Sequence, residues 1–405
     1  MMNRKNKPLF VLVGGMSALA IVMGIGRFAY TPILPYLQDF VHLSSGTAGY
    51  LASSNYLGYL LGALFAGIFR WKGGKTFPLR IFLALNILTT VAMGLTDHLP
   101  LWFILRFLSG LSSGVVFVLA SSLTLDVLAR AGKPVWAGSF YSGVGIGIFF
   151  TGLLVPWLNH YFGWQGTWIG VGLLSFFLSP FTIGWLREDL SPQREGPPPD
   201  RLSTSLPGKN KILPWLVAAY GCEGMGYIVS GTFLVALVRE IPSLNHDPAL
   251  SWVIVGLAAI PSSVLLAQAA AKWGDLNVLQ TAYFLQMIGV ILPTLLYNSY
   301  GALAGSLLFG GTFMGITTLA VSAGRRMASR ESSKVIGLLT FVYGVGQMAG
   351  PSLAGFFITG TGNYTSSLLF AAVVLGCGML FLGAGQIKAS KEKIAGSGHG
   401  SAMRP

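Results

Sequence analysis

Three ionisable side chains, Arg27, Arg106 and Glu223, lie inside long apolar stretches of the sequence. A charge at the middle of a membrane costs at least about 2.5 kcal/mol on insertion scales, so such a residue normally faces a partner or a watery cavity. Glu223, alone in an apolar site, would favour its protonated form, which suits a group that takes up and releases a proton. The arginines keep their charge and suit the binding of a carboxylate. The three residues therefore predict a site for a proton and a solute.

Each charge also has a plainer interpretation. Arg27 aligns with Tyr227 through an internal repeat, which places it about one helical turn, roughly 6 Å, from the level of Glu223. The two residues would then pair, or exchange partners when substrate arrives, and the alternative is a permanent buried ion pair that only fixes packing. Arg106 lies seven residues into its span and would either clamp a carboxylate, perturb Glu223 or extend to the membrane interface.

Polar side chains on otherwise apolar segments surround these charges. We expect most of them to form hydrogen bonds between helices and only a few to contact cargo. The predicted site for substrate and proton combines the three charges with four of these residues, namely Tyr30, Asn55, Tyr227 and Gln347. Further polar tips of the same kind are Tyr59, Tyr141, Tyr220 and Tyr343.

The composition is that of a membrane protein. Only 10% of the residues are charged and 53% are hydrophobic, whereas a soluble domain carries roughly 25% charged residues. The basic residues lie between apolar runs and form no stripe, so nucleic acid is not a predicted partner. The two cysteines lie in apolar segments and the five histidines lie in loops or in the tail, without the spacing of metal ligands. No metal or cofactor is predicted, and the missing phosphate-loop signature argues against an ATP-driven pump.

The apolar runs predict twelve membrane spans. A bilayer core of roughly 30 Å needs about 20 helical residues, and backbone without internal hydrogen bonds cannot cross it. The predicted spans lie near residues 9–36, 46–69, 78–97, 99–125, 135–158, 164–186, 213–238, 250–271, 276–297, 300–324, 334–358 and 364–386. Of the 26 basic residues, all except Arg27, Arg106 and Arg239 fall on the side of both termini. This bias predicts that both termini are cytoplasmic in a bacterial inner membrane.

Two halves of the chain repeat each other at a spacing of 200 to 202 residues. Gly24 and Gly26 correspond to Gly224 and Gly226, and a proline-rich, charged stretch separates the halves. Repeats of this kind are common in transporters. We therefore predict an all-α fold of two pseudo-symmetric six-helix bundles. The predicted parts are an N-terminal bundle (1–186), a cytoplasmic linker (187–212), a C-terminal bundle (213–386) and a disordered cytoplasmic tail (387–405).

Glycine and proline mark predicted sites of close packing and bending. Glycine pairs at four-residue spacing let neighbouring backbones approach closely, and lining a path is their alternative role. The pairs are Gly58 with Gly62, Gly110 with Gly114, and Gly311 with Gly315. Bends are expected at Pro32, Pro35 and Gly350-Pro351. We assign gating or packing roles to Gly110, Gly114, Gly143, Gly145, Gly350 and Pro351.

Two motifs carry a resemblance to a known family. The stretches GIGRFAYTPILP (24–35) and YGCEGMGY (220–227) resemble the bacterial YbfB/YjiJ-type branch of the major facilitator superfamily, and the resemblance extends over nearly the whole chain. Arg106 with Gly110 and Gly114 is similar to the family's fourth-helix motif, which is associated with proton coupling. Gly143 and Gly145 belong to a loose version of the fifth-helix glycine motif that is frequent in antiporters. The loop of residues 67–75 lacks the family's usual acid, which leaves the usual gate latch without support.

The resemblance implies a transporter whose first, fourth, seventh and tenth helices line a central cavity, which would place the three charges on it. We expect a monomeric, proton-coupled carrier of a small organic solute that works by alternating access. Two arginines against one glutamate give the cavity a weak preference for anionic or zwitterionic cargo. Proton-driven efflux of hydrophobic drugs or metabolites is the nearest alternative, supported by the aromatic and glycine-rich helices. A receptor or structural partner that binds solute without moving it is a third possibility.

Overall fold

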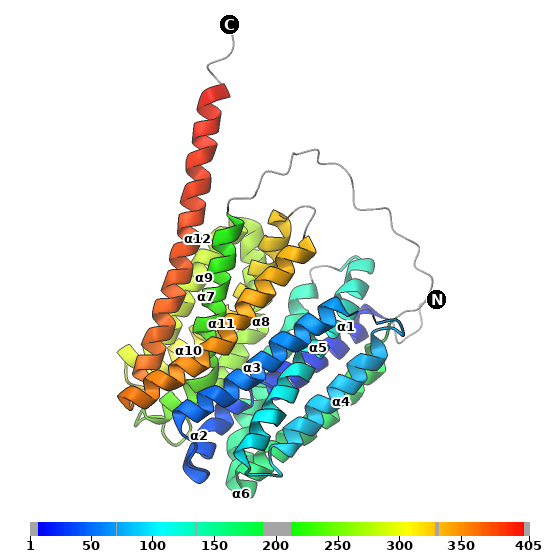
Figure 1. Ribbon diagram of the computed structural model, residues 1–405, viewed down its shortest axis with the longest axis vertical. Helices are drawn as coiled ribbons and strands as arrows, with labels where there is room; N and C mark the ends of the chain where they lie inside the picture. Colours follow the sequence, from blue (N-terminus) through cyan, green and yellow to red (C-terminus); the bar gives the residue numbers. More distant parts are fainter. Residues whose placement is uncertain (1–6, 70, 134–135, 189–211, 329–331, 401–405) are drawn as a thin grey trace.

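The computed structural model describes residues 7–69, 71–133, 136–188, 212–328 and 332–400, and these residues form helices joined by short turns (Figure 1). The described ranges contain no strand, which confirms the all-helical prediction. The helices are α1 (Pro8–Leu19), the π-helix η2 (Ala20–Ile25), α2 (Tyr30–Phe40), α3 (Ser45–Ile68), α4 (Thr76–Ala92), α5 (Leu99–Arg130), α6 (Ala137–Trp185), α7 (Leu213–Arg239), α8 (Leu250–Trp273), α9 (Asp275–Leu295), α10 (Ser299–Met327), α11 (Ser332–Thr361) and α12 (Thr365–Gly400).

Ten helical stretches of the described residues are long and apolar enough to cross a membrane. The first joins α1, η2 and α2 into one stretch, Pro8–Phe40, and a shorter apolar helix is α4 with 17 residues. Large apolar side chains such as Leu88, Phe177 and Leu380 are more than 60% exposed. Their exposure fits a surface in contact with lipid, because water would disfavour so many exposed apolar groups.

α6 is a single element of 49 residues with a break inside it. Gly163 has a φ of 66° and a ψ of −175°, far from helical values. That conformation is accessible to glycine at little cost because glycine has no Cβ. The break falls between two of the predicted spans, 135–158 and 164–186, so both of them lie in α6.

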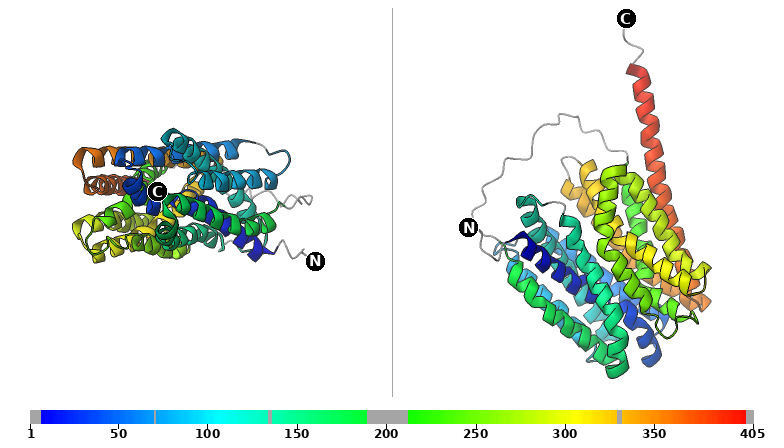
Figure 2. Two further views of the ribbon diagram at one scale, coloured as in Figure 1. Left: turned by 90° about the horizontal axis from the view of Figure 1, so that it is seen from below. Right: turned by 180° about the vertical axis from the view of Figure 1, so that it is seen from behind.

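The ends of the chain differ from the prediction in one place. α12 continues to Gly400, whereas the sequence predicted a disordered tail from residue 387. Figures 1 and 2 show this helix extending beyond the other helices. Residues 388–395 include three lysines, one glutamate and two alanines, residue types of high helix propensity, so the helix continues where apolar character ends. The predicted linker falls mostly outside the described residues.

The helices of the two chain halves form neighbouring groups (Figure 1). They meet along two long contacts, α3 with α11 and α6 with α8. Glycines permit the contact between α6 and α8, since a Cβ on Gly145 would lie 2.6 Å from the Ile260 nitrogen. Likewise, a Cβ on Gly49 of α3 would lie 2.3 Å from the Pro351 carbonyl oxygen of α11. Gly145 and Pro351 therefore serve close packing between the halves.

The first membrane-spanning stretch is not a regular α-helix. In and after η2, the Gly26 N–H donates to the Ile21 carbonyl (2.7 Å) and the Phe28 N–H to the Met23 carbonyl (3.0 Å), each one residue farther back than in an α-helix. Residues 26–29 form a turn before α2 begins. The bend predicted at Pro32 and Pro35 therefore begins earlier. Proline lacks an N–H, so Pro32 leaves the Phe28 carbonyl without its usual donor, and the irregularity lies on that side.

Candidate functional site

Arg27 lies in the turn that interrupts the first span, and it is almost completely buried, with 1% of its surface exposed. Its guanidinium carbon lies 4.4 Å from the ring centroid of Tyr59, 4.5 Å from that of Tyr56 and 5.4 Å from that of Phe28. Two tyrosines of the second half, Tyr227 and Tyr343, lie within range of electrostatic interaction. Aromatic faces attract a cation, which offsets part of the cost of burying it. Arg27 is thus a buried cation where the halves meet.

One edge of the Arg27 guanidinium has no hydrogen-bond partner among the described residues. Nη1 contacts only the Met23 sulfur at 4.0 Å. Nε and Nη2 are buried and unpartnered, although the Tyr59 side chain lies beside the group. Nε and Nη2 carry the two parallel N–H bonds with which arginine holds a carboxylate in bidentate fashion. This edge therefore has two buried donors in the arrangement that a carboxylate requires.

Arg106, on α5, is equally buried at 1% exposure, but its contacts are different. Nη1 donates to the Gly26 carbonyl at 3.2 Å and Nη2 to the Arg27 carbonyl at 3.4 Å. The group also lies 4.8 Å from the ring centroid of Tyr30. Carbonyls of an interrupted helix need donors from elsewhere, and Arg106 supplies them. The predicted extension to the membrane interface is wrong, because the side chain is directed at the broken first span.

Glu223, on α7, is completely buried. Both carboxyl oxygens lack a hydrogen bond within the described part of the chain. Gln286 of α9 lies beside the carboxyl group, and its two amide atoms are buried and unpartnered as well. Tyr220, Tyr283 and Tyr343 lie within electrostatic range. An ionised carboxylate buried without a partner is costly, and binding a proton would remove that cost.

The structure does not bring Arg27 and Glu223 together. Neither has an ion-pair partner among the described residues. The two side chains also lie outside electrostatic range of each other. The predicted pairing of the two is therefore absent here, and so is a contact of Arg106 with Glu223. Glu223 faces α9 inside the second group of helices, while Arg27 faces tyrosines of both halves. Tyr343 lies within electrostatic range of both charges.

Two of the predicted polar residues serve helix packing. The Tyr30 hydroxyl donates to the Ala48 carbonyl at 3.0 Å, and Asn55 Nδ2 donates to the Arg106 carbonyl at 2.8 Å. These contacts tie α3 to the first span and to α5. The other two, Tyr227 and Gln347, are buried and bonded to each other through the Gln347 amide and the Tyr227 hydroxyl. They lie beside Arg27 on the second-half side, since Tyr227 is within its electrostatic range.

Tyr227 belongs to a row of stacked aromatic rings in the second half. Tyr220 and Tyr343 stack at 4.4 Å between centroids, Tyr343 and Tyr227 at 5.6 Å, and Tyr227 and Phe313 at 5.8 Å. The interplanar angles are 17°, 13° and 9°. Offset stacking is a favourable arrangement for aromatic rings. This row forms one wall beside Arg27.

The glycines of the predicted packing set do not all act alike. A Cβ on Gly110 would lie 1.9 Å from the Asn55 carbonyl oxygen, and one on Gly114 would lie 2.3 Å from that of Tyr59. Gly143 and Gly350 are equally close to the backbone of Met16 and of Met225. By contrast, nothing lies within 4 Å of a Cβ on Gly311, and Gly315 meets only the side chain of Leu266. Close backbone approach was therefore predicted wrongly for Gly311 and Gly315.

Sequence reasoning missed a polar cluster behind Arg27. Asn86 of α4 is buried and donates to the Ser109 carbonyl at 3.0 Å and to Ser113 Oγ at 3.0 Å. Ser113 in turn donates to the Val22 carbonyl at 2.8 Å, and Ser109 to the Gly26 carbonyl at 3.2 Å. These bonds satisfy further carbonyls of the irregular first span. The concentration of serines around Gly110 was the available signal.

A cavity of about 370 Å³ lies where the first half meets the second. Tyr141 and Gly138 of α6 line it on one side, with Gln268 of α8 and Thr318 and Ser322 of α10 on the other. These residues lie toward the end of the bundle where α6 begins and α8 and α10 end. Tyr141 lies 6.4 Å from Phe117, which lies 6.1 Å from Tyr59 (ring centroids). A chain of aromatic contacts thus connects the cavity with Arg27.

At the opposite end, contacts between the halves close the structure. Arg239 pairs with Asp39 at 2.6 Å and donates to the Pro35 carbonyl at 3.0 Å. The Thr31 hydroxyl donates to the Gly231 carbonyl, a contact between residues separated by the repeat spacing of 200. Cooperating polar contacts of this kind hold the ends of α2 and α7 together.

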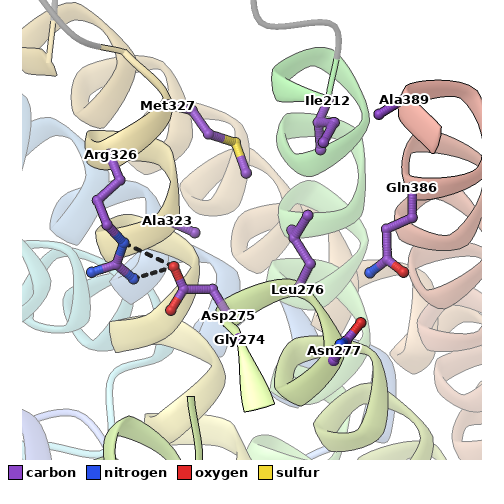
Figure 3. Close-up of a pocket in the computed structure, with 10 residues that line it drawn as sticks. All are labelled: Ile212, Gly274, Asp275, Leu276, Asn277, Ala323, Arg326, Met327, Gln386 and Ala389. Atoms are coloured by element: carbon purple, nitrogen blue, oxygen red, sulfur yellow. Dashed lines mark hydrogen bonds and ion pairs between the residues drawn. The ribbon is translucent and has the colours of Figure 1, made fainter. Parts of the chain in front are cut away.

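A second cavity, of about 530 Å³, lies within the second group of helices (Figure 3). Its charged lining consists of Asp275, at the start of α9, and Arg326, near the end of α10. Arg326 Nε donates to Asp275 Oδ2 at 2.8 Å. Figure 3 shows the two side chains directed at each other, with Leu276 and Met327 nearby. Because the two side chains bind each other and both belong to the second half, the pair fits a structural role in holding α9 and α10 together.

Comparisons with known proteins agree with the fold. A family model described as "Uncharacterised MFS-type transporter YbfB" matches residues 19–382. An uncharacterised MFS-type transporter of Yersinia pestis is 23% identical over 387 residues, covering 92% of this chain and 94% of its own. Monocarboxylate transporter 13 of Bos taurus is 30% identical over 315 residues, covering 73% of this chain and 71% of its own.

A solved structure shares the architecture. The crystal structure of a mutant of the nucleoside transporter NupG superposes with a TM-score of 0.69, covering 93% of this chain and 99% of that one, at 13% sequence identity. At this identity the likeness concerns the fold alone.

Proposed function

The chain belongs to the YbfB-type branch of the major facilitator superfamily, whose members are multi-pass membrane transporters and not enzymes. On this basis we propose that it carries a small anionic solute across the bacterial inner membrane by alternating access. In this proposal α6 counts as two spans on either side of Gly163, and α4 counts as one. The result is twelve helices in two six-helix bundles, residues 1–186 and 213–386, with both termini cytoplasmic and a monomeric carrier.

The observation that carries the proposal is the unpartnered edge of Arg27. A guanidinium that is 1% exposed and lacks partners on Nε and Nη2 leaves buried donors unsatisfied, which costs free energy until an acceptor arrives. A carboxylate on this edge would satisfy both donors at once. The name of the monocarboxylate transporter relative supports the same class of cargo.

The distribution of contacts supports an inward-facing state. The contacts of Thr31 and Asp39 with the second half close the end away from the termini, and the cavity beside Tyr141 lies at the other end. Cargo would reach Arg27 from the cytoplasmic side in this state. Rocking of the two halves would then expose Arg27 to the outside.

Glu223 is the proposed site of the coupled proton. It is buried with both oxygens unpartnered, so protonation would change the charge of the second half without moving any other group. Tyr343, which lies near Glu223 and Arg27, would pass this change to the cargo site. Arg106 has a positioning role here, through the carbonyls of Gly26 and Arg27.

Transport in proteoliposomes tests the cargo and Arg27. We expect labelled organic acids to accumulate above the level of protein-free vesicles under an imposed pH gradient. Arg27→Gln should reduce this uptake at least tenfold, since charged hydrogen bonds are worth about 1.5–3 kcal/mol. The matched control Arg325→Gln removes an exposed arginine at the end of α10 and should leave uptake unchanged. Uptake that survives in Arg27→Gln would refute the assigned role.

Glu223→Gln separates coupling from binding. We expect this variant to lose accumulation driven by the pH gradient, because glutamine cannot exchange a proton, while exchange of labelled for unlabelled cargo continues. Unchanged accumulation would remove Glu223 from the mechanism.

Efflux of hydrophobic compounds is the second candidate, favoured by the aromatic row of Tyr220, Tyr343 and Tyr227. Dye efflux and organic acid uptake are to be measured in the same vesicles across one pH gradient. Stimulation of dye efflux alone would reject the anionic cargo. Background transport under every imposed gradient would instead favour a receptor or structural partner.

A further inference from the structure

Two rows of aromatic rings, one in each half, begin near Arg27 and continue away from it. On the first-half side, Tyr59 of α3, Phe117 of α5 and Tyr141 of α6 follow one another with ring centroids 6.1 and 6.4 Å apart. On the second-half side the row consists of Tyr220, Tyr343 and Tyr227. We name these the first-half wall and the second-half wall.

The two walls face each other. Tyr59 lies within electrostatic range of Tyr220 and Tyr227, so the first-half wall lies near the second-half wall at Tyr59. Arg27 lies 4.4 Å from the Tyr59 ring and in range of Tyr343. The walls therefore share Arg27 at one end.

The first-half wall reaches the cavity between the halves at Tyr141. Tyr141 lines this cavity of about 370 Å³ directly. Thr317, which neighbours the lining residue Thr318, shares a hydrogen bond of 3.3 Å with the Tyr343 hydroxyl. Small-molecule sites begin at about 300 Å³, so the cavity is large enough to admit a small molecule beside Tyr141, while Arg27 and the second-half wall lie outside its lining.

We propose that the cargo is an aromatic carboxylate, whose carboxylate binds Nε and Nη2 of Arg27 and whose ring lies between the first-half and second-half walls. The inference rests on the proposed function and narrows its substrate class. Aliphatic acids would satisfy Arg27 equally well, but only a planar ring gains the extra stabilisation of stacked or edge-to-face contacts with tyrosine. Six aromatic side chains are more than a short aliphatic chain needs.

Binding to the purified full-length protein in detergent tests the inference, because permeation of uncharged acids through lipid then plays no part. The probes are benzoate, cyclohexanecarboxylate and benzamide, measured by calorimetry. Benzoate should bind about three- to tenfold more tightly than cyclohexanecarboxylate, as expected from an aromatic pair. Benzamide has the ring without the charge, and it should bind at least tenfold more weakly than benzoate.

Variants assign the preference to the walls. Tyr343→Leu should bind benzoate and cyclohexanecarboxylate equally, while Tyr343→Phe, which keeps the ring, should retain the preference. Tyr59→Leu provides the same test from the first-half wall, should Tyr343→Leu fail to fold. Phe176→Leu changes a ring that is 58% exposed and serves as the control, with the preference unchanged.

The outcomes separate this inference from the proposed function. Equal binding of benzoate and cyclohexanecarboxylate, both lost in Arg27→Gln, would overturn the aromatic preference and leave anion transport standing. The same holds if a small aliphatic acid binds and benzoate does not. If no carboxylate binds and none accumulates in proteoliposomes, the proposed function itself fails.

Discussion

The first span and α7 occupy equivalent places in the repeat, yet their backbones differ. α7 runs unbroken from Leu213 to Arg239, whereas the first span passes through a π-helix and a turn between Ala20 and Ala29. Both contain the glycine pair, at Gly24 and Gly26 and at Gly224 and Gly226. Shared glycines therefore do not cause the break.

Two prolines after the break distinguish the sequence of the first span from that of α7. Pro32 and Pro35 correspond at the repeat spacing to Thr232 and Val235, which have the N–H groups that a continuous helix needs. The helix that packs beside each span differs accordingly. Arg106, which binds the Gly26 and Arg27 carbonyls in the turn of the first span, corresponds to Leu307 in α10. An arginine is present where the backbone is broken and a leucine where it is not, so Arg106 supports the break that presents Arg27.

Arg106→Leu should have the largest effect on stability among the substitutions that compare the two spans. Losing two charged hydrogen bonds to the Gly26 and Arg27 carbonyls should destabilise the protein by about 3 kcal/mol or more, measured as unfolding in detergent. Leu307→Ala, at the equivalent and 56% exposed position, should cost less than about 1 kcal/mol. In a protein that also contains Pro32→Thr and Pro35→Val, the loss of unfolding free energy caused by Arg106→Leu should be about half as large. An equal cost in both backgrounds would mean that the prolines do not create the need for Arg106.

Alanine at equivalent glycines compares the halves directly. Gly110→Ala would place a Cβ 1.9 Å from the Asn55 carbonyl oxygen, and such overpacking costs about 1–3 kcal/mol. Gly311→Ala meets nothing within 4 Å, so its effect should stay within about 0.5 kcal/mol. Thermal unfolding of the two variants in the same detergent measures both effects. Similar losses of stability in the two variants would contradict the closer helix packing at Gly110 than at Gly311.

Asp39→Asn has the smallest expected effect, on the contact between α2 and α7. The pair with Arg239 is partly exposed, at 37% and 42%, so its loss should cost about 0.5 kcal/mol, or roughly twofold in the balance of states. The reporter is a cysteine at position 231, in a chain whose two native cysteines are replaced by serine. With Asp39→Asn, this cysteine should react about twice as fast with an impermeant maleimide as it does when Asp39 is kept. Arg326→Gln, which breaks a pair within one half, should leave this rate unchanged.

The sequence located the buried charges but not their partners. Hydropathy alone placed Arg27, Arg106 and Glu223 inside apolar helices, and all three are buried. Which face each one occupies depends on helix packing, so the sequence could not decide whether Arg27 and Glu223 pair, and no such pair is present among the described residues. The acceptors of Arg106 are backbone carbonyls, which no side-chain pattern marks.

Neutral residues were harder to select than charges. Gln286, beside Glu223, and Asn86, behind the first span, are buried polar groups in helices that the sequence treated as plain spans. A single amide hardly changes hydropathy, so nothing set these residues apart from other polar tips. The break at Gly163 was located better, because two apolar runs with a glycine between them signalled it.

The turn at residues 26–29 leaves α2 as a separate rod of eleven residues. An isolated helix of this length is marginal by itself, so α2 depends on its neighbours, among them the Tyr30 contact with α3 and the Thr31 and Arg239 links to the second half. Separating the two links to the second half would loosen α2 directly after the turn that contains Arg27. If the proposed function holds, opening this end of the bundle and changing the surroundings of Arg27 would then occur in one movement.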